Sequence, residues 1–575
     1  MTIFRAQGPP FVPPRDDMTL PQFILDDVDA ERTRPVRPAH VPCLIDSETG
    51  KAVHLGEVRA APQLGRHALA RSLKARWNIG ICSTSSKTLI SPCRLRRHRF
   101  IWAIKRLGGS VAAHSSTLTA DEFAYQLGIT ESSLVVAYPS NLQVALSAMK
   151  ACRIPETSLV LLDGHLAPDA PFPPIESLIE EHESHAPYVE HKFKPGEAKT
   201  AVAFLCFSSG TTGNPKAVAV SHSNAICAII QNAMSNRLNE QYTPWKDQRF
   251  RPGDICDGTL RSGHRLMYRL IQMTLVVAKA FVFEKYLQNI QRYRITNLTM
   301  VPPQAVLLCK HPLTKKYDLS SVRYCVVAAA PLSPELTTEL LKVMLNGAPL
   351  PGLAGMTETS WVVSNFPTSM KVGVLGSCGR LAPGTIAKVV KEDGELAGVG
   401  ESGELLVQGP QIVVGYFRIP KATEEAFDNG WLRTGDEVRF DAEGNIFIVD
   451  RIKELIKVKG LQVAPSELEG YLLSDPDVAD AAVIGVPDEY AGELPRAYVV
   501  LKPVVADAVK KDERLAGQVR AGLYETIASA AAKYKRLEGG IEFMDAIPKN
   551  PSGKILRRVL REQGQRSGGQ ARARL

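Results

Sequence analysis

Residues 208–216 read Ser-Ser-Gly-Thr-Thr-Gly-Asn-Pro-Lys, and this stretch decides how the rest of the chain is interpreted. It follows an apolar run at 201–207 that is typical of a buried strand, and it precedes a helical pattern that begins near Ser221. Its glycines can expose consecutive backbone N–H groups, while its hydroxyls and its lysine can donate hydrogen bonds to phosphate oxygens. The stretch therefore predicts a loop that cradles a polyphosphate. The residues expected to form it are Ser208, Ser209, Gly210, Thr211, Thr212, Gly213 and Lys216.

Two other interpretations of this loop exist. An ordinary Ser/Gly surface loop is the simpler interpretation of any glycine-rich segment taken alone. A P-loop kinase would carry the pattern G-x-x-x-x-G-K-[ST], in which a hydroxyl residue follows the lysine. Here Lys216 follows Asn-Pro and precedes Ala217, so the kinase interpretation is disfavoured.

Length and composition indicate a globular protein of more than one domain. The chain has 575 residues, of which 45% are hydrophobic and 22% charged. Its longest apolar stretches, at 201–207 and 275–283, are shorter than the roughly 20 residues needed to span a bilayer. The N-terminus combines Arg5 with several prolines and lacks the apolar run of a signal peptide. We therefore expect no transmembrane segment and synthesis in the cytoplasm.

The spacing of the cysteines and the distribution of charge argue against a disulfide-bonded, a zinc-binding and a nucleic-acid-binding protein. The ten cysteines are scattered singly and form no C-x-x-C pair, so the sequence predicts neither a disulfide framework nor a zinc site. The net charge of +9 is spread along the chain, apart from a basic run at 94–99 and the last few residues. That distribution argues against nucleic-acid binding.

Alternating apolar strands and amphipathic helices predict an α/β fold with largely buried strands. From about Gly384 the pattern changes to short strands and glycine turns, including a turn at 441–445, which predicts a β-rich lobe. After Asp450 the remaining residues read as a small α+β domain. The expected strands are 133–138, 158–162, 201–207, 403–408, 478–485 and 496–501, with a strand-turn-strand unit at 440–449, and the expected helices are 119–126, 334–345, 465–474 and 513–537.

The chain is thus expected to have four parts. Residues 23–450 form a large N-terminal domain of layered sheets and helices with the β-rich lobe, and residues 451–561 form a small, mobile lid domain. Residues 1–22 are expected to be disordered and residues 562–575 to be a flexible tail, because both are rich in Pro, Gly, Arg or Gln.

Four further motifs follow the loop along the chain. They are Gly355-Met356-Thr357-Glu358-Thr359, Gly430-Trp431-Leu432-Arg433-Thr434-Gly435-Asp436, Asp450-Arg451-Ile452-Lys453-Glu454-Leu455-Ile456-Lys457 and Pro548-Lys549-Asn550-Pro551-Ser552-Gly553-Lys554. With these motifs the chain resembles the adenylate-forming (AMP-binding) superfamily of acyl-CoA synthetases, 4-coumarate-CoA ligases, luciferases and peptide-synthetase adenylation domains. The resemblance is specific, because the motifs keep the superfamily's order from 208 to 554.

The resemblance implies a role in adenylate formation for each motif. Thr357 would contact the α-phosphate, and Glu358 would bind Mg²⁺, an ion that prefers carboxylate oxygens. Asp436 would accept hydrogen bonds from the ribose hydroxyls, and Arg451 would contact the nucleotide. Lys554 would enter the site during adenylation. The attack of a carboxylate on the α-phosphorus brings two anions together, so a cation has to be in place.

The resemblance also implies two half-reactions in one pocket. The small domain would rotate about Lys453 after adenylation, so that Lys554 leaves and a different face reaches the adenylate. Coenzyme A would be the acceptor in this second step. The residues on that face are Lys457, Lys459, Gly460 and Gln462.

Several places depart from the superfamily's pattern. Ala354 stands where an aromatic residue usually precedes the Gly-Met-Thr-Glu signature, and the adenine-side segment is Ala328-Ala329-Ala330-Pro331, with Ala329 as the candidate contact. The segment 254–267 reads DICDGTLRSGHRLM, where relatives have an apolar strand and a Pro-aromatic-x-His motif. His264 is the candidate active-site histidine there, with a surface histidine as the alternative. Residues 79–99 depart as well, and retained introns, reading-frame errors or local decay are a hypothesis for both irregular segments.

The predicted function is ATP-dependent activation of a carboxylic acid to an acyl-adenylate, followed by thioester formation with coenzyme A and release of AMP and pyrophosphate. An aromatic acid and a fatty acid both fit this prediction. A stand-alone adenylating enzyme or luciferase-like oxygenase is one alternative. A catalytically impaired homologue that binds nucleotide without turnover is another.

The final tripeptide, Ala573-Arg574-Leu575, resembles the peroxisomal Ser-Lys-Leu address. We therefore expect a peroxisomal import receptor as a partner and a peroxisomal location, with the cytoplasm as the alternative. A chance ending of an Arg- and Gly-rich tail is the competing interpretation.

Overall fold

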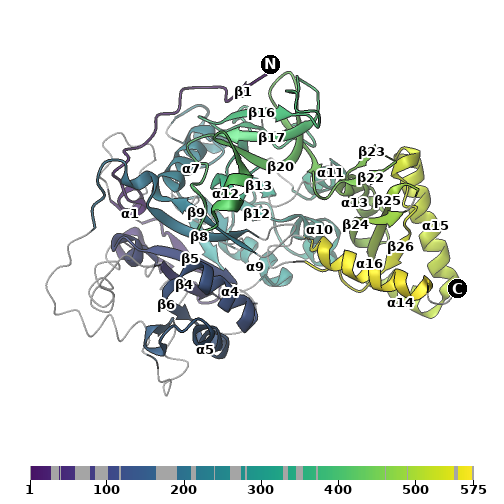
Figure 1. Ribbon diagram of the computed structural model, residues 1–575, viewed down its shortest axis with the longest axis horizontal. Helices are drawn as coiled ribbons and strands as arrows, with labels where there is room; N and C mark the ends of the chain where they lie inside the picture. Colours follow the sequence, from purple (N-terminus) through teal and green to yellow (C-terminus); the bar gives the residue numbers. More distant parts are fainter. Residues whose placement is uncertain are drawn as a thin grey trace.

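The computed structural model describes residues 2–26, 38, 40–58, 78–83, 101–115, 118–162, 172, 191–208, 215–238, 240–258, 273–278, 281–327, 334–344, 354–370, 373–459, 461–488, 490–549 and 555–572. Figure 1 shows a large body and a small body, the latter in green and yellow. The large body holds three sheets of six or seven strands and one of two strands, and the small body holds a sheet of five strands. The small body is formed by the last part of the chain, so the two bodies follow one another in sequence.

The predicted phosphate loop belongs to a seven-stranded sheet with the order β18-β9-β8-β5-β4-β6-β7. Strands β4 to β8 run parallel, and β9 and β18 join one edge in antiparallel pairs. The expected strands at 133–138, 158–162 and 201–207 are confirmed as β6, β7 and β8, whereas β9 was not expected. The elements are β4 (Asn78–Ser83), β5 (Ser110–Ser115), α4 (Ala120–Thr130), β6 (Ser132–Ala137), α5 (Leu142–Ala151), β7 (Leu159–Leu161), β8 (Val202–Ser208), β9 (Lys216–Ser221) and β18 (Gly415–Tyr416).

A second sheet has the strand order β13-β12-β10-β11-β2-β3 and is parallel except for the edge pair of β2 and β3. Apolar residues of its strands and of three helices are buried in one cluster, which includes Leu287, Leu298 and Leu340. Helix α11 confirms the helix expected at 334–345. The elements are β2 (Leu44–Asp46), β3 (Ala52–Val53), β10 (Ile255–Asp257), β11 (Thr274–Val277), α9 (Phe283–Tyr293), β12 (Asn297–Met300), α10 (Pro302–Lys310), β13 (Tyr324–Val327) and α11 (Pro334–Val343).

Helix α7 (His222–Ser235) begins where the sequence predicts, because Ser221 and Asn224 form a capping box. The Asn224 backbone N–H donates to Ser221 Oγ at 3.0 Å, and the Ser221 N–H donates to Asn224 Oδ1 at 3.1 Å. The Asn224 side chain also donates to the carbonyls of Pro410 and Ile412, at 3.0 and 2.8 Å. The start of α7 is therefore tied to the segment that leads out of the β-rich lobe.

The β-rich lobe expected after Gly384 is an antiparallel sheet with the order β1-β16-β17-β20-β19, in which β21 also pairs with β20. The turn expected at 441–445 is present, since Asp441 Oδ1 accepts from the Asn445 N–H at 2.7 Å. The elements of the lobe and its surroundings are β1 (Phe4–Arg5), β14 (Ser364–Asn365), β15 (Arg380–Leu381), β16 (Ile386–Val390), β17 (Gly403–Gln408), α12 (Pro420–Ala426), β19 (Phe427–Asp428), β20 (Trp431–Phe440) and β21 (Ile446–Arg451).

The N-terminal residues differ from the disorder expected at 1–22. Strand β1 pairs with β16, and the Phe4 ring stacks on the Phe440 ring with centroids 4.0 Å apart. Helix α1 (Leu20–Leu25) begins with a capping box on Thr19, and Leu20 is fully buried. Apolar contacts therefore hold this proline-rich segment at both ends, and composition alone does not reveal such contacts.

The small body is the α+β domain expected after Asp450. Its strand order is β23-β22-β25-β24, with β26 parallel to β25. Sheet and helices share one apolar core that includes Ile456, Leu468 and Leu523. The elements are β22 (Ile456–Val458), β23 (Leu461–Val463), α13 (Pro465–Ser474), β24 (Val478–Asp488), β25 (Gly492–Leu501), α14 (Pro503–Lys511), α15 (Glu513–Ala530), β26 (Ile541–Phe543) and α16 (Arg557–Arg572).

Helix α16 differs from the flexible tail expected from residue 562, because it continues to Arg572. Its first half is anchored on the sheet: Leu560 is buried, and Tyr498 Oη donates to the Leu560 carbonyl at 3.3 Å. Once a helix is anchored in this way, each added residue contributes one backbone hydrogen bond, which extends it through a Gly- and Arg-rich sequence.

The fold class predicted from the sequence is confirmed, with layered α/β sheets, a β-rich lobe and a small α+β domain. Among the helices of the described residues, none combines the length and the apolar character that crossing a bilayer requires.

Candidate active site

The two strands that flank the predicted phosphate loop form an antiparallel pair. Ser208, the last residue of β8, is the register partner of Lys216, the first residue of β9. The loop therefore closes a β-hairpin, and α7 begins at the far end of β9, about 20 Å away along an extended strand of six residues. The predicted loop residues at 209–214 lie outside the described residues, so their phosphate contacts stay a prediction.

Lys216 lies beside Tyr416, which in turn is hydrogen-bonded to Glu358, and both residues come from other parts of the chain. Its Nζ is 4.9 Å from the centroid of the Tyr416 ring, and Tyr416 Oη donates to Glu358 Oε1 at 2.9 Å. Tyr416 belongs to β18, which pairs with β9, and Glu358 belongs to the 3₁₀ helix η7 (Thr357–Thr359). Glu358 is buried, so this hydrogen bond satisfies and orients its carboxylate. We call Lys216, Tyr416 and Glu358 the phosphate cluster.

The electrostatics of the phosphate cluster connect it to its neighbours. Burial raises the pKa of Tyr416, and the charge of Glu358 raises it further, so the phenol stays a neutral hydrogen-bond donor. The positive charge of Arg451 lowers the same pKa in part. Burial also raises the pKa of Cys206 on β8 to about 12, with Lys105 opposing this rise and Glu358 adding to it.

The backbone around the Gly-Met-Thr-Glu signature is tightly constrained. Ser360 and Trp361 have φ angles of 46° and 73°, a left-handed conformation that is uncommon for residues with a side chain. A Cβ at Gly355 would lie 2.2 Å from the Trp361 carbonyl oxygen, so only glycine fits there. This turn places Thr357 and Glu358 in successive positions of η7.

Ala354, where relatives have an aromatic residue, is buried with apolar residues of the β-rich lobe such as Val363 and Leu405. Its backbone N–H donates to Ser364 Oγ at 3.0 Å, and its carbonyl accepts from the Val363 N–H at 2.9 Å. The methyl group is thus part of the lobe's core. Ala329, the other adenine-side candidate, lies outside the described residues.

Asp436 and Arg451 face each other on neighbouring strands, and we call them the nucleotide pair. They are register partners in β20 and β21, and Arg451 Nε lies 2.8 Å from Asp436 Oδ1. The Asp436 N–H donates to Thr434 Oγ1 at 3.1 Å, and the Thr434 hydroxyl donates to the Leu405 carbonyl at 2.8 Å. The structure therefore joins two residues for which the sequence predicted separate nucleotide contacts.

Three residues predicted for the thioester step lie on the β22–β23 hairpin, which we call the hinge hairpin. Lys457 and Gln462 are register partners, and Lys459 lies between the strands with a φ of 51°. Lys457 Nζ is 3.4 Å from Glu392 Oε1, in an exposed pair that joins the hinge hairpin to the β-rich lobe. Lys459 Nζ lies 4.6 Å from the centroid of the Tyr490 ring.

The remaining hinge residues complete this arrangement. Lys453 lies in the turn that connects β21 to β22, at the passage from the large body to the small one. Gly460 lies outside the described residues. Within the described part of the chain, no hydrogen bond or ion pair joins the hinge hairpin to the phosphate cluster. The structure thus keeps the two predicted sets of catalytic residues on separate elements.

The structure describes the two ends of the C-terminal lysine loop. Lys549 and Ile555 form an antiparallel bridge, and the Leu556 N–H donates to the Pro548 carbonyl at 2.8 Å. Lys549 Nζ also pairs with Asp480 Oδ2 at 2.5 Å. Lys554 lies outside the described residues, so its entry into the active site stays a prediction. The final tripeptide, 573–575, lies outside them as well.

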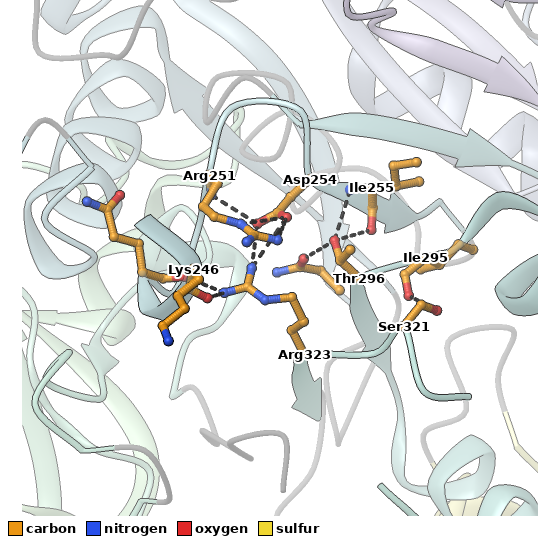
Figure 2. Close-up of polar contacts among 10 residues, drawn as sticks. Lys246, Arg251, Asp254, Ile255, Ile295, Thr296, Ser321 and Arg323 are labelled. Atoms are coloured by element: carbon orange, nitrogen blue, oxygen red, sulfur yellow. Dashed lines mark hydrogen bonds and ion pairs between the residues drawn. The ribbon is translucent and has the colours of Figure 1, made fainter. Parts of the chain in front are cut away.

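The irregular segment at 254–267 begins as a regular strand, because β10 pairs in parallel with β11 and β12. Figure 2 shows Arg251 and Arg323 directed at the buried Asp254 carboxylate, with contacts of 2.8 and 3.1 Å. The N–H of Ile255, the first residue of β10, donates to Oγ1 of Thr296, the residue that precedes β12, at 2.9 Å. The charged residues therefore flank this strand without disrupting it. His264 lies outside the described residues.

Tyr416 is a site residue that sequence reasoning missed. It stands in a strand of only two residues, Gly415–Tyr416, which is too short to show any periodicity. Its position beside Lys216 and Glu358 depends on the pairing of β18 with β9, which joins segments that are about 200 residues apart.

Two family models match this chain. Residues 68–417 match the family model of the AMP-binding enzyme, and residues 467–554 match that of the AMP-binding enzyme C-terminal domain. The chain is 32% identical to 4-coumarate–CoA ligase-like 2 of Arabidopsis thaliana over 567 residues, covering 96% of this chain and 93% of that protein. It is 34% identical to acyl-CoA synthetase 7 of Caenorhabditis elegans over 466 residues, covering 80% and 81%.

Solved structures share the fold. The anthranilate CoA ligase AuaEII, in complex with anthranoyl-AMP, matches with a TM-score of 0.79 and 21% identity, over 96% of this chain and 98% of that one. The ATP-bound MatB of Rhodopseudomonas palustris matches with a TM-score of 0.75 and 24% identity, over 95% and 99%. The chain therefore belongs to the AMP-binding enzyme family and is an acid–thiol ligase.

Proposed function

We propose that this ligase works in two steps at one site, with the residues described above in distinct roles. ATP first converts a carboxylic acid to an acyl-adenylate, and the thiol of coenzyme A then displaces AMP. The observation that carries the assignment of roles is that the phosphate cluster and the nucleotide pair are both held on elements of the large body, whereas the hinge hairpin belongs to the small body. One set serves the nucleotide, and the other is free to serve the thiol.

In the adenylation step the acid carboxylate attacks the α-phosphorus and pyrophosphate leaves. Lys216 and the loop hydroxyls hold the outer phosphates, while Thr357 contacts the α-phosphate. Asp436 accepts hydrogen bonds from the ribose hydroxyls, and Arg451 supplies positive charge on the same side. Lys554 bridges the acid carboxylate and the nucleotide, because two anions approach each other only when a cation is in place.

Glu358 is the proposed ligand of Mg²⁺. Its carboxylate is a hard oxygen donor that would hold the ion, and the Tyr416 hydroxyl orients this carboxylate through its hydrogen bond. Within the described residues no group of three or more His, Cys, Asp or Glu side chains forms a protein-only metal site. That fits an ion which completes its shell with water and with ATP phosphates. When bound, the ion would neutralise charge on the phosphates.

In the thioester step the small domain turns about Lys453 and brings the hinge hairpin to the adenylate. Lys457 and Gln462 reach the site together because they are register partners. The Lys457–Glu392 contact has to break in this motion, and its cost is small because both side chains are exposed. Lys459 and Gly460 then contact coenzyme A.

We propose an aromatic acid of the hydroxycinnamate type as the substrate. The support is that relatives matched along almost their whole length are named as 4-coumarate–CoA ligase and ligase-like proteins. A fatty acid is the second candidate, since another relative over four fifths of the chain is named as an acyl-CoA synthetase.

Pyrophosphate release from a panel of aromatic and short- to long-chain acids, measured with and without coenzyme A, tests the proposal. We expect release that depends on the acid and a thioester only when coenzyme A is present. Release without any thioester would instead favour a stand-alone adenylating enzyme or an oxygenase. No release with any acid would favour an impaired homologue.

A further inference from the structure

Arg557 connects three segments of the small domain through a buried network of charges. It is the first residue of α16, and its side chain is 10% exposed. Its Nη2 donates to both carboxylate oxygens of Glu469 on α13, at 2.8 and 3.1 Å. Its Nη1 lies 3.5 Å from Glu454 Oε2 in the hinge segment. One guanidinium thus joins the hinge, α13 and α16.

Asp450 extends this network on the hinge side. Its Oδ2 accepts from the Ser466 N–H at 3.1 Å and from Ser466 Oγ at 2.9 Å, which fixes the hinge on the start of α13. Burial alone would lower the pKa of Arg557, but the charges of Glu469, Glu454 and Asp450 raise it overall. Burial raises the pKa of Glu469 to about 7, although Arg557 opposes this rise.

Such a network is weak evidence for stability, because taking several charges out of water costs about as much as their attraction returns. Its clear consequence is geometric. A guanidinium with two carboxylate partners accepts few orientations, so the start of α16 cannot shift relative to the hinge without breaking the Arg557–Glu454 ion pair.

The start of α16 is also one stem of the C-terminal lysine loop. Ile555 forms the bridge with Lys549, the Leu556 N–H donates to the Pro548 carbonyl at 2.8 Å, and Arg557 comes next. Lys554 is bonded directly to Ile555 along the chain. The base of the loop is therefore held by backbone bonds on one side and by the Arg557 network on the other.

We propose that Arg557 is a positioning residue that holds the hinge and the stem of the Lys554 loop as one rigid unit, so that Lys554 reaches its place between the acid carboxylate and the nucleotide. This inference rests on the role proposed above for Lys554. It predicts that loss of Arg557 harms adenylation, which needs Lys554, far more than thioester formation from an adenylate supplied in advance.

The test compares Arg557→Met with Arg558→Met. Arg558 is the next residue of the same helix, but it is 74% exposed and pairs only across one turn with Glu562 at 2.8 Å. We expect Arg557→Met to lower kcat for pyrophosphate release by roughly tenfold or more, since a small misplacement of a catalytic group has effects of this size. KM for ATP and thioester formation from presupplied adenylate should stay within about twofold, and Arg558→Met should resemble the wild type in every measurement.

Equal loss in both half-reactions, or no loss in either, overturns the inference. If Arg557→Met does not fold, Glu454→Gln provides the same test, because it removes the hinge charge but leaves the Arg557–Glu469 contact in place. It should show the same selective loss, and unchanged adenylation in this variant counts against the inference. Lys554→Ala is measured in parallel: if it keeps full adenylation, the proposed function is wrong, whereas a loss there without a loss in Arg557→Met refutes only the positioning role.

Discussion

The two lysine loops proposed for the active site are held in different ways. The loop that ends at Lys216 is closed by the Ser208–Lys216 register of an antiparallel strand pair inside a seven-stranded sheet. The loop that carries Lys554 is closed by a single bridge, Lys549 to Ile555, and by side-chain charges on a small domain. The first belongs to a layered core, and the second depends on a unit that is linked to the core by a hinge.

This difference predicts which substitutions should impair both half-reactions and which should impair only one of them. A sheet-borne cation stays at the site throughout, so changes near Lys216 should affect every use of ATP. A cation on the small domain acts only in the conformation that presents it. Selectivity between the two half-reactions is therefore the measurement that separates the regions.

The largest effect is expected for Lys554→Ala. Adenylate formation should fall by about 10²–10³-fold, because the variant lacks the charge that offsets the approach of two anions. Thioester formation from presupplied acyl-adenylate should be nearly unchanged. Half-reaction kinetics with pyrophosphate and thioester readouts check this, and an equal fall in both steps would contradict the two-conformation mechanism.

A smaller loss is expected in the phosphate cluster, where Glu358→Gln should lower adenylation by roughly 10²-fold at a fixed Mg²⁺ concentration. Tyr416→Phe should have a milder effect on the same step. It keeps the ring beside Lys216 but removes the hydrogen bond to Glu358, so half-saturating Mg²⁺ should rise about tenfold while the rate at saturating Mg²⁺ stays close to that of the wild type. Mg²⁺ titrations of the initial rate measure both, and unchanged kinetics in Glu358→Gln would remove the metal assignment.

A still smaller effect is expected on the hinge hairpin, and it should fall on the thioester step instead of on adenylation. Lys457→Met should slow thioester formation from presupplied adenylate by about tenfold, with adenylation retained. Glu392→Gln is the matched control, since it removes the same exposed ion pair from the other side and should leave both steps and the thermal midpoint unchanged. If the two variants behave alike, Lys457 acts through its contact with the lobe and not on the adenylate.

The last prediction concerns stability instead of turnover, with changes of only a few degrees in the thermal midpoint. Burial lowers the pKa of Lys105 to about 7, and its ammonium lies 3.6 Å from the Phe204 ring centroid below β8. Because the unfolded chain binds this proton up to about pH 10.5, the wild type should gain stability over Lys105→Met as pH rises from about 7. Glu469 has the opposite shift, so the wild type should lose stability relative to Glu469→Gln between about pH 4.5 and 7.

Thermal midpoints of the wild type and both variants, measured from about pH 4.5 to 10.5, should give two slopes of opposite sign, because burial lowers the pKa of the lysine and raises that of the glutamate. Parallel slopes would show that the two buried charges are not the source of the pH dependence. Each variant is the control for the other, because one charge lies below the sheet of the large domain and the other lies in the small domain.

Local features of the fold could be predicted from the sequence. Strand β8, the start of α7 and the turn at 441–445 are each specified by neighbouring residues: an apolar run, a Ser221–Asn224 capping box and an Asp–Gly turn. Strand β9 was missed because the glycine loop was expected to lead directly into the helix at Ser221, although the apolar residues at 217–220 are typical of a short buried strand. The order at the N-terminus was missed because it depends on Phe440, which is more than 400 residues from Phe4.

The candidate site likewise has features that the sequence predicts and features that only the folded structure shows. The sequence by itself determined the family, the residue types of the phosphate loop, and the acids and lysines that chemistry at a polyphosphate requires, because these are properties of short contiguous motifs. Only the tertiary structure decided that Tyr416 orients Glu358, that Asp436 pairs with Arg451, and that Arg557 ties the hinge to the Lys554 loop. These contacts arise from strand register and from the burial of charge, and both depend on which distant segments the folded core brings together.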